Sequence, residues 1–348
     1  MSDTFPVAAW QMLEDAALFP AAGMLAPWAK AEAQLSRRGH LLAMANGKPV
    51  GAFRASLRGH VIRPVKTALT FSGLPLIADA GALEQLFIQT GAAAVHFRAI
   101  PAVGPFWDSL NALGSSRLKV LHTWERAALS TQGDFADWFE QGFERKRRKE
   151  YRRLRTRLGE TGTLESLALV PGIDPTPWTR ELLDLEARGW KGARGTALAA
   201  SPKTAALLAQ ALKELAEQGH LRFWKLALDG RPLAMMFALV HGSQAWLGKI
   251  AHDENFAKFS PGVLLVLDAT AALFADQMIH HVDSCAIPDH PMINHVWRER
   301  LPLADVLVAG PNASPVRFGA LVAWERCKIA ARAKARAAYY TVTKRRQS

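Results

Sequence analysis

The chain has 348 residues, 49% hydrophobic and 21% charged, and this length and composition predict two globular domains rather than one. Its two cysteines give no disulfide framework and no metal-ligand spacing. No apolar stretch is long enough to span a membrane, and the N-terminus lacks the basic region of a signal peptide. We therefore expect a cytoplasmic protein that associates at most peripherally with the inner membrane. The net charge of +12 is concentrated in residues 141–160 and 324–348, and such basic segments contact the phosphates of lipids or nucleic acids.

Residues 1–140 predict a first α/β domain. Its clearest signal is Asn46-Gly47 between two apolar runs, which is typical of a β-hairpin because both turn positions need positive φ. The spacing of apolar residues predicts, in chain order, a hairpin at Leu41–Leu57, a helix at Leu83–Thr90, a strand at Ala94–Ala99, a helix at Pro105–Leu113 and a strand at Val120–Leu129.

Residues 141–160 predict a basic linker helix, with Phe143, Tyr151, Leu154 and Leu158 along one side. A second α/β domain follows over residues 161–318. Its predicted helices are Trp178–Arg188, Lys203–Gln218, Val263–Ala275 and Met292–Arg298. Its predicted strands are Leu221–Leu228, Leu233–Val240, Ala245–Ala251, His280–Cys285 and Asp305–Val308. Residues 319–348 predict a basic amphipathic tail in which Trp324, Tyr339 and Tyr340 are interleaved with cations.

The two domains contain an internal repeat. Gly47 lies 183 positions before Gly230, and Gly59 lies 183 positions before Gly242. Gly47 and Gly230 each begin a Gly-basic-Pro sequence at a predicted hairpin turn. A matched hairpin at a constant offset predicts a duplicated fold. A helix start in the second domain has no counterpart in the first. There Ser260 suits an N-cap, Pro261 the first helical position, and Gly262 a close approach of ligand to backbone. Such a start is either an anion site or simply a capped helix.

Several motifs of the second domain resemble the CelD-type family of GNAT acyltransferases. They are Lys249–Leu265, with the sequence Lys-Ile-Ala-His-Asp-Glu-Asn-Phe-Ala-Lys-Phe-Ser-Pro-Gly-Val-Leu-Leu, together with Leu185–Gly192, the basic stretch Lys146–Gly159 and the Asp-Gly-Arg-Pro-Leu-Ala hairpin. The family is related to the FemAB peptidyltransferases, which use aminoacyl-tRNA, and resembles the bacterial ceramide synthases, which acylate a sphingoid amine. The resemblance implies two tandem GNAT-like α/β domains with mixed central sheets, joined by the basic helix.

The resemblance also implies an acyl-CoA co-substrate. Its pyrophosphate is expected at the helix start, on Ser260, Pro261, Gly262, Val263 and Leu264. The first domain, which lacks this motif, is expected to be a scaffold or an acceptor platform.

N-acyl transfer needs a deprotonated amine, a polarised carbonyl and a group that moves protons. The polar segment Asp283–His290 is the densest supply of such groups. We expect His290 to act as the base, because imidazole titrates near neutrality, with Asp283 orienting it. Asp253 is a further catalytic candidate, and Cys285 is either a nucleophile or a buried thiol. The alternative for this segment is a polar loop in which Asp289 caps the next helix.

Trp190, Lys249 and Asp289 are candidates for binding substrate, and no metal site is expected. The function we predict is acyl-CoA-dependent acylation of an amine. The favoured acceptor is a lipid amine such as a sphingoid base, reached at an anionic membrane surface through the basic helix and tail. The alternatives are an acetyltransferase of exopolysaccharide biosynthesis, a FemAB-like transferase that uses charged tRNA, and a non-catalytic GNAT pair.

Overall fold

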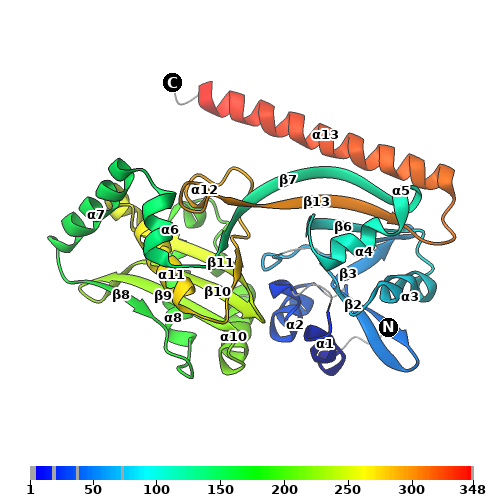
Figure 1. The fold of residues 1–348 in the computed structure, drawn as a ribbon, viewed down its shortest axis with the longest axis horizontal. Helices are drawn as coiled ribbons and strands as arrows, with labels where there is room; N and C mark the ends of the chain where they lie inside the picture. Colours follow the sequence, from blue (N-terminus) through cyan, green and yellow to red (C-terminus); the bar gives the residue numbers. More distant parts are fainter. Residues whose placement is uncertain (1–4, 18–20, 37–38, 72–73, 346–348) are drawn as a thin grey trace.

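The protein has two α/β halves that lie side by side, and a long C-terminal helix runs above them (Figure 1). This computed structural model describes residues 5–17, 21–36, 39–71 and 74–345, with side chains at all of these positions except 22, 80 and 336–345. The side chains of Tyr339 and Tyr340 therefore lie outside the described part. No helix in the described ranges combines the length and apolar character that crossing a membrane requires.

Within the described residues, the N-terminal half contains every element that the sequence predicted there, with ends shifted by a few residues, together with four further helices and three further short strands. Its helices are α1 (Val7–Glu14), η1 (Ala22–Met24), α2 (Ala26–Leu35), α3 (Ala80–Thr90), α4 (Pro105–Asn111) and α5 (Gly114–Arg117). Its strands are β1 (Leu41–Ala45), β2 (Lys48–Phe53), β3 (Ala55–Arg58), β4 (Val61–Pro64), β5 (Leu76–Ile77), β6 (Ala94–Pro101) and β7 (Leu118–Ser130). The unpredicted α1 and α2 bury the indole rings of Trp10 and Trp28.

The described part of the C-terminal half also contains every element that the sequence predicted there, together with five elements that it did not predict. Its helices are α6 (Phe135–Gly142), α7 (Arg145–Gly159), α8 (Thr176–Arg188), α9 (Trp190–Ala193), η2 (Leu198–Ala200), α10 (Pro202–Glu217), η3 (Glu254–Phe259), α11 (Pro261–Ala275), α12 (Ile293–Val296) and α13 (Pro315–Arg345). Its strands are β8 (Leu164–Ala168), β9 (Leu221–Leu228), β10 (Arg231–His241), β11 (Gln244–His252), β12 (His281–Asp283) and β13 (Glu299–Ala309).

Several of these elements differ in length from the prediction, and for three of them the structure shows the local reason. β12 ends two residues early, because Cys285 takes a left-handed conformation (φ +50°) while its N–H bonds Asp283. α12 ends before Trp297, whose extended backbone lets the buried indole donate to Thr270 at 3.0 Å. β13 is much longer than Asp305–Val308, since it pairs along most of its length with β7.

The duplicated fold predicted from the repeat is confirmed by turns and strand pairing. Asn46-Gly47 and Asp229-Gly230 both have positive φ, with values of 50° and 75°, and 49° and 75°. β4 pairs in parallel with β6, just as β11 pairs in parallel with β12, and each pair encloses a helix in the chain. The tandem GNAT-like α/β architecture is therefore observed.

The two halves nevertheless share one mixed sheet, with the strand order β3-β4-β6-β13-β7-β12-β11-β10-β9-β8, beside a small sheet β1-β2-β5. The long strands β7 and β13 exchange neighbours, because β7 of the first half pairs with β12, and β13 of the second half pairs with β6 (Figure 1). A hydrophobic cluster also joins Trp28 and Leu69 to Leu208 and Phe237. The division of the chain at residues 141–160 stays a prediction.

The basic segments form α7 and most of α13. α7 buries Tyr151, Leu154 and Leu158 on the predicted side and packs them against the core of the C-terminal half. α13 begins at Pro315, before the predicted tail, and packs Phe318 and Val322 on the first half. Trp324 stays 62% exposed, with the Lys328 ammonium 5.9 Å from its ring centroid.

Candidate active site

β11 and β12 part in the middle of the C-terminal half. Their parallel pairing runs from Gln244 opposite His281 to Trp246 opposite Asp283 and stops there, although β11 continues to His252. A cavity of about 270 Å³ opens between the unpaired part of β11 and the segment from Ser284 to Ile293. We call it the central cavity. Beyond Trp246, the backbone edge of β11 that faces β12 therefore has no strand partner among the described residues. A ligand that pairs with a strand needs such a free edge.

A β-bulge lies in this unpaired part of β11. Phe237 of β10 stands opposite both Gly248 and Lys249, between the pairs Met236–Ile250 and Ala238–Leu247. Gly248 is required there, because a Cβ atom would lie 2.0 Å from the Phe237 ring. A bulge re-aims the side chains that follow it and takes backbone groups out of the ladder. We had not selected Gly248, although an isolated glycine inside an apolar strand is a signal of a bulge.

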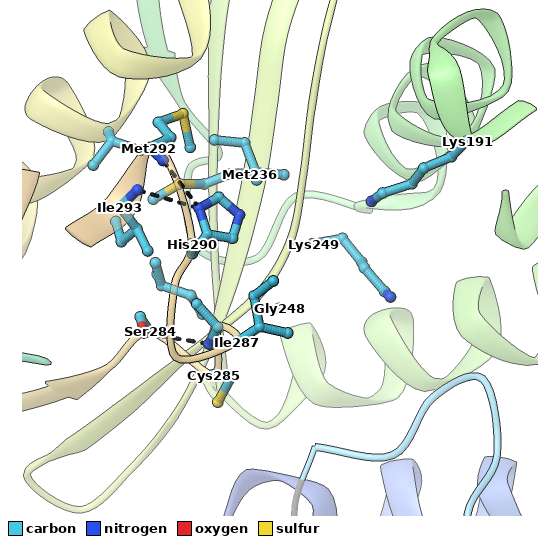
Figure 2. Close-up of a pocket in the computed structure, with 14 residues that line it drawn as sticks. Lys191, Met236, Gly248, Lys249, Ser284, Cys285, Ile287, His290, Met292 and Ile293 are labelled. Atoms are coloured by element: carbon cyan, nitrogen blue, oxygen red, sulfur yellow. Dashed lines mark hydrogen bonds between the residues drawn. The ribbon is translucent and has the colours of Figure 1, made fainter. Parts of the chain in front are cut away.

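Lys249 lines the central cavity from this bulge (Figure 2). It makes no hydrogen bond or ion pair with the described residues. Burial lowers the pKa of Lys249, and the nearby ammonium of Lys191 lowers it further against the opposing effect of Glu186. Lys191 lies on the same side of the cavity in Figure 2 and forms an ion pair with Glu186 at 2.9 Å. Among the residues that the structure describes, no carboxylate lines this cavity, so its lining is electropositive. Lys191 belongs to a motif that we had noted, but we had not singled it out.

His290 lies on the other side of the central cavity (Figure 2). Its Nδ1 accepts hydrogen bonds from the backbone N–H groups of Met292 and Ile293, both at 3.3 Å. Burial, with a smaller effect of Lys191, lowers the pKa of His290, so the neutral ring is favoured. With Nδ1 accepting, the proton of the neutral ring is on Nε2. In this geometry the Nε2–H of His290 is the group available to donate a hydrogen bond to the cavity, and its expected role as the proton-abstracting base stays a prediction.

Asp283 and Cys285 have structural partners. The Asp283 carboxylate, 6% exposed, forms an ion pair with the buried guanidinium of Arg126 and accepts the Cys285 N–H at 2.9 Å. In the described part of the chain no hydrogen bond joins it to His290, so the predicted orienting role has no contact to support it. Burial, and then the Asp283 charge, raises the pKa of the Cys285 thiol well above its usual value. A protonated thiol is a poor nucleophile, which argues against an acyl-enzyme at Cys285.

The two other acidic candidates lie outside the central cavity. Asp253 is buried, accepts the Asn255 N–H at 3.0 Å and pairs with Arg231 at 2.7 Å, so it caps η3 rather than facing a substrate. Asp289 is exposed and does not cap α12, since His290 takes the two N–H groups at that helix start. Neither carboxylate is positioned here for proton transfer.

The start of α11 lies next to Met292, which lines the central cavity. A Cβ atom on Gly262 would lie 3.2 Å from Met292 Sδ and 3.5 Å from His252 Nδ1, so only glycine leaves this space open. Pro261 occupies the first helical position, as predicted. Ser260 is the N-cap residue, but it is left-handed (φ +51°) and its hydroxyl makes no capping bond.

Ser260 uses its carbonyl instead, accepting the N–H groups of Val263 at 2.9 Å and Leu264 at 3.1 Å. Of the residues expected to hold an anion, only Gly262 thus has an N–H without a partner among the described residues. The helix start fits a pyrophosphate through that N–H and the helix dipole, and less fully than the sequence suggested.

A second cavity of about 400 Å³ continues from the central one and shares Ile250, His290 and Met292 with it. We call it the apolar cavity, because apolar side chains are the larger part of its lining: Leu185, Trp190, Ile250, Ala251, Ile287, Pro291 and Met292. Trp190 stands at its rim, 51% exposed, and its backbone N–H donates to Glu254 at 2.7 Å. The structure thus places Trp190, Lys249 and His290 around two joined cavities.

Comparisons with known proteins show what the sequence and the fold are similar to. Residues 145–290 match the family model of the acetyltransferase (GNAT) domain. The fold is similar to a structure of FemX (TM-score 0.55, 11% identity, 87% of this chain and 95% of that one). It is also similar to a structure of L-PGS from Bacillus licheniformis (TM-score 0.53, 12% identity, 91% of this chain and 96% of that one). A third similar structure is the C-terminal domain of a putative lysylphosphatidylglycerol synthetase from Agrobacterium fabrum (TM-score 0.54, 12% identity, 88% and 92%). A search of curated proteins finds no significant match.

The matched segment contains β11, its bulge, α11 and His290, so most residues that line the two cavities lie within the segment that resembles this domain. The structural similarities, at this level of identity, concern the fold alone. The match is to the broad GNAT domain family, and the narrower CelD-type resemblance stays a prediction. Within the described ranges, no group of three His, Cys, Asp or Glu side chains is placed to hold a metal ion.

Proposed function

We propose that the protein transfers an acyl group from acyl-CoA to an amine in the central cavity. The observation that carries this proposal is the parting of β11 from β12 beside that cavity, within the GNAT-type domain. The free edge of β11 offers N–H and C=O groups to the amide-containing arm of CoA. The Gly262 N–H at the start of α11 suits its pyrophosphate.

The charges around the cavity suit the chemistry of this reaction. An amine attacks only when it has lost its proton, and the ammonium groups of Lys191 and Lys249 disfavour a bound ammonium by repulsion. The same charges, with the Nε2–H of His290, stabilise negative charge that develops on the acyl oxygen. The amine nitrogen forms the new bond to the acyl carbon and the C–S bond breaks. As the amide forms, the attacking neutral amine loses one N–H proton, and the departing thiolate takes up one proton. The products are therefore an amide and CoA thiol.

The acceptor that we propose is an amine with a long apolar chain, such as a sphingoid base. The apolar cavity, with the exposed side chains of Trp190 and Ile287 at its opening, supports an apolar substrate. Basic α7 and the exposed Trp324 on α13 support peripheral binding to an anionic membrane at the cytoplasmic face.

The test is the thermal midpoint of the purified protein with acyl-CoAs of rising chain length, with free CoA and tRNA as controls. A ligand that binds only the folded protein raises the midpoint, and a hundredfold excess over Kd stabilises by about 2.7 kcal/mol. We expect a rise with CoA that grows with chain length. Release of CoA thiol with a long-chain amine, measured against an amino sugar, then distinguishes the lipid acceptor from a polysaccharide precursor. A flat response to every CoA contradicts the proposal.

A charged tRNA as donor is the second candidate, and α7 is the observation that favours it. Arg145, Lys146, Lys149 and Arg157 are exposed on α7 and make no ion pair with the described residues. Such a row of cations suits a phosphate backbone. A midpoint that rises with tRNA and not with CoA, and a tRNA affinity that falls steeply with salt, would replace acyl-CoA by aminoacyl-tRNA as the donor.

A further inference from the structure

The N-terminal half contains a parting of strands at the position that corresponds to the central cavity. β4 and β6 pair in parallel at Val61 opposite Ala94 and Ile62 opposite Val95, and the pairing stops there. With the 183-residue offset of the repeat, Val61 corresponds to Gln244, where the pairing of β11 with β12 begins. By the same offset, Lys66 corresponds to Lys249. The duplicated fold thus opens twice, and the second opening is not part of the candidate active site.

A cavity of about 560 Å³ lies at this second opening, between β3, β4, β6 and α13. We call it the basic cavity. Six cations line it, supplied by the strands and by successive turns of α13, and only two carboxylates do so. The cations are Arg58, Arg63, Lys66, Arg98, Lys328 and Arg332. The carboxylates are Asp305 and Glu325, so with neutral histidine the cavity has an excess of four positive charges.

The two carboxylates are already used by the inner cations. Glu325, only 3% exposed, pairs with both Arg63 at 2.7 Å and Lys328 at 2.9 Å. Asp305 lies 3.8 Å from Arg98 and accepts the Ala99 N–H at 2.8 Å. The floor of the cavity is thus a fixed network, and its residual charge is positive.

Three cations remain around this network. Arg58, Lys66 and Arg332 are exposed and make no ion pair or hydrogen bond within the described residues. They come from β3, from the segment after β4 and from α13, so the fold brings together charges that are far apart in the sequence. Cations that surround one concave space repel one another, and a multiply charged anion in that space removes the repulsion.

We propose that the basic cavity binds an organic phosphate with at least two negative charges, held by Arg58, Lys66 and Arg332. Guanidinium groups match phosphate oxygens in pairs, and two of these three side chains are arginine. A volume of about 560 Å³ suits a small molecule or a lipid headgroup. The first half then contributes to a binding site that is separate from the candidate active site.

The experiment measures binding of inorganic pyrophosphate by calorimetry. The variant combines Arg58→Gln with Arg332→Gln, and the matched control combines Lys48→Gln with Lys203→Gln, which removes two exposed charges elsewhere. We expect the affinity to fall at least tenfold in the first variant and to change less than twofold in the control. Unchanged thermal midpoints of both variants exclude unfolding as the cause. No binding by the wild type, or equal binding by both variants, overturns the proposal.

A second measurement distinguishes the source of the phosphate. Vesicles of phosphatidylcholine with and without phosphatidic acid, whose phosphate monoester can carry two negative charges, are sedimented with each variant. Binding that needs phosphatidic acid, Arg58 and Arg332, and that pyrophosphate displaces, assigns the cavity to a lipid headgroup. Pyrophosphate binding that depends on the two arginines while vesicle binding does not assigns it to a soluble phosphate ester. The variant with both arginines replaced should still release CoA thiol from acyl-CoA and the amine, which separates this proposal from the proposed acyl transfer.

Discussion

Arg126 on β7 and Asp283 on β12 form a buried ion pair between the two halves of the protein. Both residues are nearly excluded from solvent, at 5% and 6% exposure. β7 comes from the first half of the chain and β12 from the second, so this pair lies where the shared sheet passes from one half to the other. The carboxylate that the sequence suggested for catalysis therefore stabilises the sheet beside the cavity.

Replacing Asp283 by leucine should destabilise the protein by about 3 to 5 kcal/mol, because it leaves the Arg126 charge buried without a partner. Arg126→Met should have a similar effect. The double variant should be less destabilised than the sum of the two, since it leaves no unpaired charge. Urea unfolding of the four proteins measures this coupling. Single variants that each lose less than about 1 kcal/mol would show that the pair is solvated and of little importance.

Gly248→Ala should destabilise the protein by about 1 to 3 kcal/mol, because the added Cβ overlaps the buried Phe237 ring and overpacks the core. Phe237→Leu provides the matched test, since a smaller side chain makes room for the methyl group. We expect the double variant to be more stable than the sum of the single effects. Strict additivity of the unfolding free energies would mean that the bulge does not depend on this contact.

The sequence predicted what local chemistry determines. Asn46-Gly47 and Asp229-Gly230 formed the expected turns because their residues accept positive φ, and the apolar period of α7 placed Tyr151 and Leu154 in the core. The exchange of β7 and β13 between the halves could not be predicted this way. Alternating side chains indicate that a strand exists, but they do not select its neighbour.

The candidate site, like the fold, could be predicted from the sequence only where local chemistry determines it. The motif around Ser260 correctly located a helix start, but not the left-handed backbone that directs the Ser260 carbonyl to two of the N–H groups. The loop Asp283–His290 was selected as a candidate site because polar residues are dense in it. The roles of its side chains depended on partners distant in the sequence, such as Arg126 for Asp283, and on the turn in which His290 accepts two backbone N–H groups.

Gly262→Val should weaken CoA binding at least tenfold, because its side chain would fill the space beside Met292 and His252 and cover the free N–H. Gly319→Val is the matched control, since that glycine is exposed on α13 with no atom near its Cβ position. Calorimetry with CoA, together with thermal midpoints, measures the effect. Equal affinities in the two variants would remove the α11 start from the donor site.

His290 should titrate below its ordinary value of 6.5, because burial and the Lys191 charge lower its pKa. The ring is then neutral at pH 7 and becomes charged only as the pH falls. NMR of labelled histidine measures the midpoint directly. Lys191→Met should raise that midpoint, and Lys203→Met, at an exposed site on α10, should leave it unchanged. A wild-type midpoint at or above 6.5 would contradict the neutral donor that we infer for the cavity.

His96 beneath α13 should make the stability of the protein depend on pH. Burial lowers its pKa from 6.5 to about 4 in the folded state, and Arg63, Arg98 and Lys328 lower it against the opposing charge of Glu325. Between these two values the unfolded chain binds more protons, so stability falls as the pH drops from 6.5 toward 4.

This pKa shift corresponds to about 3 kcal/mol of unfolding free energy, which is the most that His96 can contribute between its two pKa values. His96→Gln cannot titrate, and should lose correspondingly less stability over the same range. Urea unfolding at several pH values, in buffers without phosphate so that the basic cavity is not filled, compares the two proteins. Parallel curves for wild type and His96→Gln would mean that His96 is hydrated and charged in the folded protein. The packing of α13 over β6 that buries it would then be wrong.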